Sequence, residues 1–146
     1  MWESSVNAIL ESAEDNDAVA LKLDALAHSL PMEGQVEATQ HMVNLLGDES
    51  YQLARRKLAN PATPREVMDV IYSDVLNRPN TVKLPALVDV LAVPGHPLHA
   101  ESLETLRVFV ERDLGNDLPA WNVAVQEFLR EESRQESATA AQPDAP

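Results

Sequence analysis

Apolar residues recur at intervals of three and four along most of the chain, which is the spacing of one face of an α-helix. Val19, Leu23 and Leu26 show this spacing, and polar residues occupy the positions between them. Prolines, glycines and capping residues interrupt the pattern at intervals. The pattern predicts eight helices joined by short connections, with no strand, over about residues 2–13, 16–30, 33–46, 48–60, 64–77, 82–91, 97–115 and 117–130.

Local signals mark several of the expected helix starts. The run from Glu14 to Asp17 offers an Asp or Asn as an N-cap, and Asp117 offers another before the last helix. The segment Thr63–Glu66 predicts a capping box, with Thr63 as the N-cap and a proline in the first helical position. Pro85 is expected within the first turn of its helix, because a deeper proline removes a backbone hydrogen bond.

A seven-residue phrase occurs twice in the chain, 33 residues apart. Leu58–Pro64 and Leu91–Pro97 both read Leu-Ala-x-Pro-x-x-Pro, and a partial copy ends at Pro31 with a similar offset. Self-similarity at this period is typical of helical solenoids. The first proline of the phrase is expected to stop one helix and the second to start the next. The sequence therefore predicts three antiparallel hairpins flanked by single helices.

The repeated segments resemble HEAT-type repeats, in which each unit is a pair of antiparallel helices. Residues 81–91 resemble a first helix, residues 97–106 resemble a second helix, and residues 64–68 resemble the start of another second helix. The arginine that often follows the valine in the family is replaced by Met68 and His99. The resemblance covers about residues 19–130. It implies an all-α, right-handed stack of helix hairpins that acts in scaffolding and protein binding rather than in catalysis.

The periodicity also indicates how the chain is divided. We expect a single helical-repeat domain over residues 1–130. Apolar periodicity ends near Glu131, and Ser, Gln, Ala and Pro dominate from there to the last residue. This composition predicts a disordered, acidic and polar tail over residues 131–146.

The charge of the chain narrows the class of its partners. The formal net charge is −13, from 24 acidic and 11 basic residues. Because nucleic acids and anionic lipids repel such a chain, we expect a protein partner and no nucleic acid. No stretch of 18 apolar residues occurs, so we expect no insertion into a membrane. The sequence indicates no compartment, and a soluble part of a longer, membrane-anchored protein stays one alternative.

Few residues carry the patterns of catalysis or metal binding. The chain has no cysteine, which excludes disulfides, thiolate nucleophiles and cysteine-based zinc sites. His96 and His99 have a spacing that could hold a metal ion, but no third ligand lies near them in the sequence. No Gly-x-Ser-x-Gly motif or phosphate-binding glycine loop occurs. We therefore expect no enzymatic activity, no metal and no cofactor.

The expected function is a non-enzymatic scaffold that binds a partner on the concave face formed by the second helix of each hairpin. The candidate binding residues are the polar positions between the core stripes of those helices: Gln40, Asn44, Asp69, Asp74, Glu104 and Arg107. Two alternatives stay open. One is an acidic decoy that occupies the basic, nucleic-acid-binding surface of another protein, and the other is a metal-dependent module at His96 and His99.

Overall fold

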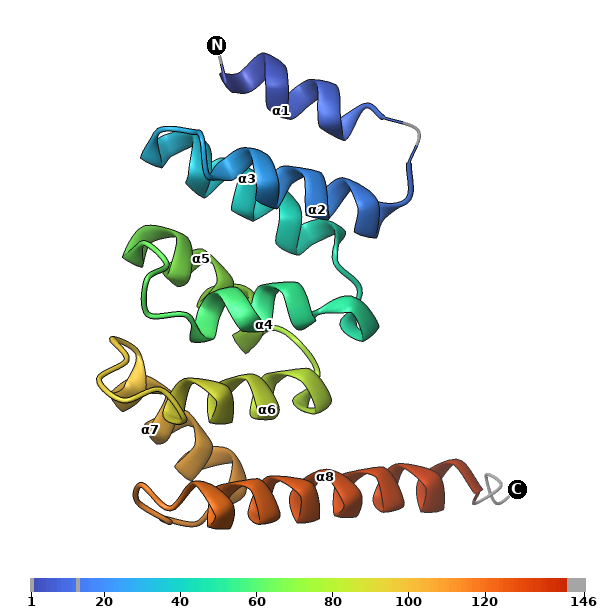
Figure 1. Cartoon of the computed structure of the whole chain (residues 1–146). Coiled ribbons are helices and arrows are strands. Elements are labelled where there is room, and N and C mark those ends of the chain that lie inside the picture. Colours follow the sequence, from blue (N-terminus) through green and yellow to red (C-terminus); the bar gives the residue numbers. More distant parts are fainter. Residues whose placement is uncertain (1, 13, 142–146) are drawn as a thin grey trace. The chain divides into compact units, whose positions relative to one another are not determined.

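A computed structural model describes residues 2–12 and 14–141. Within these ranges the chain forms eight α-helices, one short 3-10 helix and no strand (Figure 1). The prediction of an all-α chain with eight helices is confirmed. The elements are α1 (Trp2–Leu10), α2 (Asn16–Ala27), α3 (Met32–Leu45), η1 (Asp48–Ser50), α4 (Gln52–Ala59), α5 (Arg65–Leu76), α6 (Asn80–Leu91), α7 (His99–Val110) and α8 (Leu118–Ala141).

Contacts divide the chain into two compact units, of which the first ends at Ala86 and the second begins at Leu87. The first unit holds α1 to α5 and the start of α6. The second unit holds the end of α6 with α7 and α8. The single domain expected over residues 1–130 therefore includes residues of both units.

Two helix hairpins, α2–α3 and α4–α5, form most of the first unit, and α3 packs against α5 (Figure 1). The evenly spaced prolines lie just before the second helix of each pair. Pro31 directly precedes α3, Pro64 directly precedes α5, and Pro97 lies two residues before α7. The repeated prolines in the sequence therefore mark helix starts that recur at a similar interval along the chain.

Side-chain contacts between the two hairpins follow the same period. The hydroxyl of Ser50 donates a hydrogen bond to Asp17 over 2.7 Å, and the ammonium group of Lys57 pairs with Asp24. Each pair joins residues that are 33 positions apart. Equivalent positions of successive hairpins are thus in direct contact.

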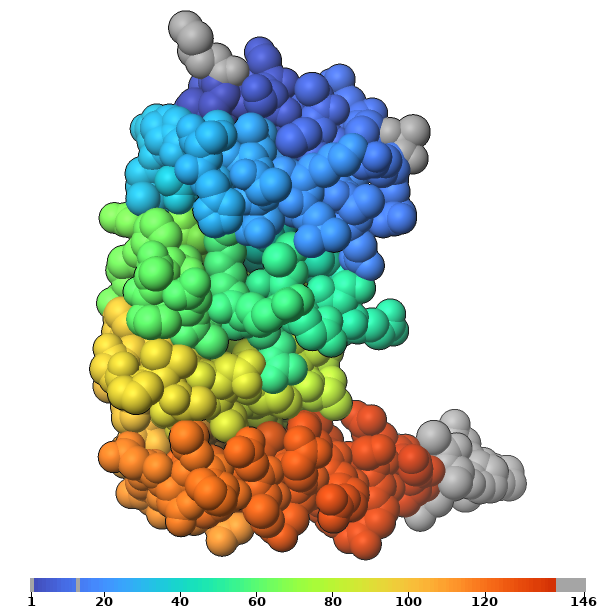
Figure 2. All heavy atoms as spheres, in the orientation of Figure 1, coloured from blue at the N-terminus to red at the C-terminus, as the bar shows by residue number. Residues whose placement is uncertain are grey.

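Apolar side chains fill the core of the first unit. In Figure 2 the atoms of α1 to α5, drawn in blue and green, lie closely against one another. Trp2 and Val6 of α1 pack on this core through Val19 and Leu23 of α2. Gly34 allows α1 to approach α3, because a Cβ atom at this position would lie only 3.1 Å from Cδ2 of Trp2. The most deeply buried residues of this core include Leu23, Met42, Leu58, Met68, Ile71 and Val75.

Trp121 belongs to the core of the second unit. It is fully buried, and its indole Nε1 donates a hydrogen bond to the carbonyl oxygen of Gly115 over 2.8 Å. Asp117 caps α8 by accepting a hydrogen bond from Ala120, as predicted. The expected helix over residues 97–115 was too long, because Glu111 adopts a left-handed conformation and ends α7.

Two local predictions are wrong. Thr63 does not cap α5, because its hydroxyl donates a hydrogen bond to the carbonyl oxygen of Lys57 instead, over 2.7 Å. Pro64 takes the N-cap position, so the predicted capping box is out of register. Pro85 lies inside α6, beyond its first turn. It leaves the carbonyl of Thr81 without a helical partner, and Thr81 is exposed, so water can reach it.

The last helix is longer than the sequence predicted. The structure continues α8 through residues 131–141, where we expected the disordered tail to begin, and residues 142–146 lie outside the described residues. Glu, Arg, Gln and Ala are good helix formers, so the end of apolar periodicity does not require the end of a helix. Among the described helices, none has the length and apolar character needed to span a bilayer.

Candidate functional site

Four of the six candidate binding residues lie in one hollow between α3 and α5. Gln40 and Asn44 come from α3, and Asp69 and Asp74 come from α5. Because α3 and α5 pack side by side, polar positions at helical spacing on each of them face a common space. The hollow has a volume of about 570 Å³, and its other lining residues are Val43, Val70, Ser73 and Asn77.

A second hollow continues from the first, with Gln40 lining both. It has a volume of about 520 Å³ and lies between α1, α3 and α5. Its other lining residues are Trp2, Met32, Glu33, Val36, Glu37 and Glu66. We name the two hollows together the α3–α5 groove, and the second hollow its Trp2 end.

The six candidate residues predicted from the sequence do not include the glutamates of the Trp2 end, although the sequence contains a signal for them. Glu33, Glu37, Gln40 and Asn44 follow one another at intervals of three and four residues, so they form one stripe along α3. Gln40 and Asn44 were selected as candidates and the two glutamates were not. Extending the stripe by two turns toward the start of the helix would have found them.

The lining of the groove is strongly acidic. Among the described residues, five carboxylates and no Lys or Arg side chain line it. Arg65 pairs with Asp69 over 2.9 Å, and Arg78 pairs with Asp74 over 2.9 Å. Among the described residues, Glu33, Glu37 and Glu66 form no ion pair or hydrogen bond through their side chains. The uncompensated negative charge is therefore concentrated at the Trp2 end.

The Trp2 end also exposes apolar surface. Met32 is 38% exposed, and Trp2 and Val36 are partly exposed beside it. Aromatic and Met side chains are enriched at protein interfaces, where they provide large apolar contacts. This part of the groove therefore combines an apolar patch with carboxylates around it.

Asp74 is bound into a network within the first unit. The hydroxyl of Tyr51 donates a hydrogen bond to Oδ2 of Asp74 over 2.6 Å, and Nε of Arg78 donates to the same oxygen over 2.9 Å. The guanidinium of Arg78 also lies 4.4 Å from the centroid of the Tyr51 ring. Burial raises the pKa of the Tyr51 hydroxyl well above its usual value, and the hydrogen bond to Asp74 raises it further.

The same arginine joins α5 to the end of α3. Nη1 of Arg78 donates to the carbonyl oxygen of Leu46 and to Asp48, each over 2.9 Å, and Nη2 donates to the carbonyl oxygen of Val43 over 2.6 Å. The last carbonyls of a helix have no partner within the helix, so Arg78 caps α3 from the next hairpin. This network holds the groove at its Asp74 end.

Glu104 and Arg107, the other two candidates, lie on α7 in the second unit. Nη1 of Arg107 lies 3.6 Å from Oε2 of Glu104, and Nε of Arg107 lies 3.1 Å from Oδ1 of Asp113. The backbone N–H of Gly115, together with Arg107, holds the pKa of Asp113 below its usual value. The two candidates thus form a local charge cluster on α7.

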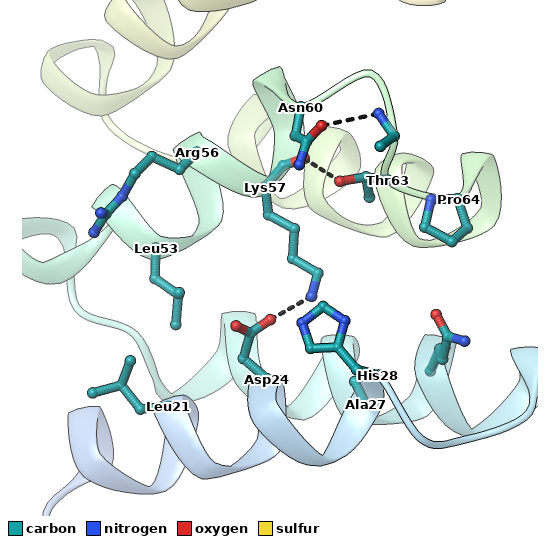
Figure 3. Close-up of a pocket in the computed structure, with 12 residues that line it drawn as sticks. Leu21, Asp24, Ala27, His28, Leu53, Arg56, Lys57, Asn60, Thr63 and Pro64 are labelled. Atoms are coloured by element: carbon teal, nitrogen blue, oxygen red, sulfur yellow. Dashed lines mark hydrogen bonds and ion pairs between the residues drawn. The ribbon is translucent and has the colours of Figure 1, made fainter.

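A third hollow, of about 690 Å³, lies between α2 and α4 (Figure 3). Lys57 extends across it to Asp24, with His28 beside the ion pair, while Arg56 points away from Asp24 (Figure 3). Asn60 accepts a hydrogen bond from the backbone of Ala62 over 2.9 Å. The Lys57 ammonium group, which reaches across this hollow, is therefore already paired with a carboxylate.

His96 lies in the turn before α7, and His99 is the first residue of α7. His96 is buried, and its Nδ1 accepts a hydrogen bond from the backbone N–H of Leu98 over 3.0 Å. Within residues 2–12 and 14–141, no group of three or more His, Asp or Glu side chains is placed to hold a metal ion. The hydrogen bond to Leu98 gives His96 a part in the geometry of the turn.

Comparison with protein-family models, curated proteins and solved structures finds no match to this chain. The function therefore has to be inferred from the α3–α5 groove and the fold that supports it.

Proposed function

We propose that this chain is a HEAT-like helical-repeat module that binds a partner protein in the α3–α5 groove and catalyses no reaction. In this proposal α2–α3 and α4–α5 are successive units of a right-handed superhelix, and α3 and α5 are their second helices. Helices that begin 33 residues apart, after Pro31 and Pro64, support the assignment of units. So do the contacts between residues at the same separation, such as that of Asp24 with Lys57.

One observation carries the proposal. Gln40, Asn44, Asp69 and Asp74 line a single groove, which continues into an apolar end beside Trp2. A polar surface with an exposed apolar patch at one end has the composition of a protein interface. The other large hollow, between α2 and α4, is spanned by an internal ion pair and offers less free surface.

Site-specific crosslinking in the native cell tests the proposal. A photo-crosslinking amino acid at Ser73, which lines the groove, is expected to form an adduct with a defined protein. The same amino acid at Ala25, an exposed position on α2, is the control. Equal adducts at both positions, or no adduct at Ser73 or at Gln40, would contradict the proposal.

Variants that change the charge of the groove test whether the groove is needed for formation of the Ser73 adduct. Gln40→Lys, Asn44→Lys and Asp69→Lys together should abolish the Ser73 adduct and leave the helical circular dichroism unchanged. Glu104→Lys with Arg107→Glu tests whether α7 contributes. Loss of the adduct in this second variant alone would move the interface to α7.

A second candidate function is supported by the free carboxylates of Glu33, Glu37 and Glu66. An acidic decoy would place such groups on the basic, nucleic-acid-binding surface of another protein. Its adduct at Ser73 would be displaced by duplex DNA or by RNA, whereas an adduct with a partner of another kind would not respond to nucleic acid.

A further inference from the structure

We propose that the occupant of the α3–α5 groove is a cationic protein segment with one apolar anchor residue, seated at the Trp2 end. This inference rests on the proposed function and adds the chemistry of the partner. The segment places Lys or Arg residues against Glu33, Glu37 and Glu66, and an apolar side chain against Trp2, Met32 and Val36.

The charge of the groove selects a cationic occupant. Glu33, Glu37 and Glu66 line one hollow and have no side-chain partner among the described residues. A second copy of the chain would bring a further net charge of −13 to this surface, so self-association is disfavoured. Lys and Arg side chains of a partner would neutralise these carboxylates instead.

The apolar patch selects an anchor residue within that cationic segment. Met32 and Val36 lie one helical turn apart on α3, and each directly precedes a glutamate, Glu33 or Glu37. Apolar and acidic positions therefore alternate around the same hollow rather than forming separate regions. A segment with positive charge alone would leave the surface of Trp2, Met32 and Val36 in water, whereas an amphipathic one would cover it.

The patch is held in place by the core beneath it. Trp2 packs on the cluster of Val6, Val19 and Leu23, and Gly34 lets its ring approach α3 closely. A rigid aromatic ring in a fixed position binds at a lower cost in conformational entropy than a mobile one. Its face can also accept a Lys or Arg side chain through a cation–π contact.

The remainder of the groove sets the orientation of the segment. Asp69 and Asp74 are paired with Arg65 and Arg78, and the other polar residues there are uncharged: Gln40, Asn44, Ser73 and Asn77. The groove is thus strongly anionic at the Trp2 end and weakly so at the Asp74 end. The basic residues and the anchor of the partner are expected at the Trp2 end, and neutral polar residues at the other.

Peptide titration of the full chain tests the inference. The probe is a synthetic 16-residue peptide of Lys, Ala and Gln with one central Leu. Two matched peptides replace the Leu by Ser, or every Lys by Glu. The chain has two tryptophans, and Trp121 is fully buried in the other unit, so Trp2 reports binding through its fluorescence. Trp2→Phe should abolish the fluorescence signal. Isothermal titration calorimetry measures the affinity independently of tryptophan fluorescence.

We expect the Lys–Leu peptide to shift the emission of Trp2 to shorter wavelength, and its affinity to fall at least tenfold between 50 and 300 mM salt. The Ser peptide should bind at least tenfold more weakly, and the Glu peptide should not bind. Glu33→Gln, Glu37→Gln and Glu66→Gln together should weaken binding at least tenfold. The control variant Glu101→Gln, Glu127→Gln and Glu136→Gln has the same net charge and should change the affinity less than twofold.

Several outcomes would overturn the inference. Equal affinity for the Leu and Ser peptides would show that no anchor site exists, and an equal loss in both triple variants would show attraction by net charge alone. Self-association of the chain that requires Trp2 would make a second copy the occupant. A specific adduct at Ser73 together with no binding of the Lys–Leu peptide would refute the cationic segment and keep the proposed function. Absence of both would refute the two together.

Discussion

Arg78 donates a hydrogen bond from Nη2 to the carbonyl oxygen of Val43 over 2.6 Å. Val43 belongs to the last turn of α3, and Arg78 follows the end of α5. The contact therefore joins the ends of the second helices of two successive hairpins. Because Val43 also lines the α3–α5 groove, the contact fixes one wall of that groove.

Arg78→Met should destabilise the first unit by about 2–4 kcal/mol, because the carbonyls of Val43 and Leu46 lose the Arg78 donor and the Asp74 carboxylate loses its cationic partner. The side chain of Arg78 is only 14% exposed, so water replaces those hydrogen bonds poorly. Arg65→Met is the control, since the pair of Arg65 with Asp69 is half exposed and should contribute less than about 0.5 kcal/mol. Urea unfolding followed by circular dichroism measures both. Equal losses would contradict the role given to Arg78.

Stability should fall in alkaline solution because of Tyr51. Below about pH 10 the hydroxyl keeps its proton in the folded and unfolded states alike. Above that value only the unfolded chain releases the proton, since the pKa of Tyr51 is raised in the folded state. Unfolding then becomes more favourable by about 1.4 kcal/mol per pH unit. Tyr51→Phe should flatten this decline, and Tyr72→Phe should keep it. An equally steep decline in the Tyr51 variant would exclude the effect.

The ion pair of Asp24 with Lys57 should contribute measurably to stability. Its side chains are 21% and 15% exposed, whereas those of Glu14 and Lys22 are 43% and 51% exposed. A double-mutant cycle with Asp24→Asn and Lys57→Met should give a coupling of about 1–2 kcal/mol. The same cycle on Glu14 and Lys22 should give less than about 0.5 kcal/mol. A coupling no larger for Asp24 with Lys57 would mean that the ion pair does not join the hairpins.

Gly34→Ala should move Trp2 with little change in stability. The added Cβ would lie 3.0 Å from Cβ of Leu30 and 3.1 Å from Cδ2 of Trp2, so the indole must shift. Alanine is better than glycine in a helix by about 1 kcal/mol, which offsets the crowding. We expect the emission of Trp2 to move to longer wavelength. Gly47→Ala is the control, because nothing lies within 4 Å of that Cβ. An unchanged emission of Gly34→Ala would refute the close approach.

Features set by neighbouring residues could be predicted from the sequence. The N-caps Asp15 and Asp117 accept the expected backbone hydrogen bonds, from Ala18 and Ala120. Each repeated proline precedes a helix because its fixed φ angle suits a helix start and disfavours continuation from the residues before it. These are local effects, and they account for where α2, α3, α5, α7 and α8 begin.

Features that depend on distant residues could not be predicted in this way. Thr63 has the correct spacing for a capping box, but the end of α4 lies within reach of its hydroxyl and takes its hydrogen bond. Arg78 gave no local signal, since its partners Val43 and Asp48 lie 35 and 30 residues earlier. The acidic Trp2 end depends on α1 packing beside α3, which the helix pattern does not specify. The polar residues of the groove between α3 and α5 could therefore be predicted from the helix pattern, and its Trp2 end could not.

The contacts of Asp17 with Ser50 and of Asp24 with Lys57 join adjacent hairpins with one common offset. A hairpin that carries acceptors at these positions on its first helix can receive a following hairpin that carries the donors. A copy of one hairpin alone would instead place two acceptors or two donors opposite each other, because each contact joins equivalent positions. The array could therefore be lengthened in steps of two hairpins, with the acceptors of one hairpin opposite the donors of the next.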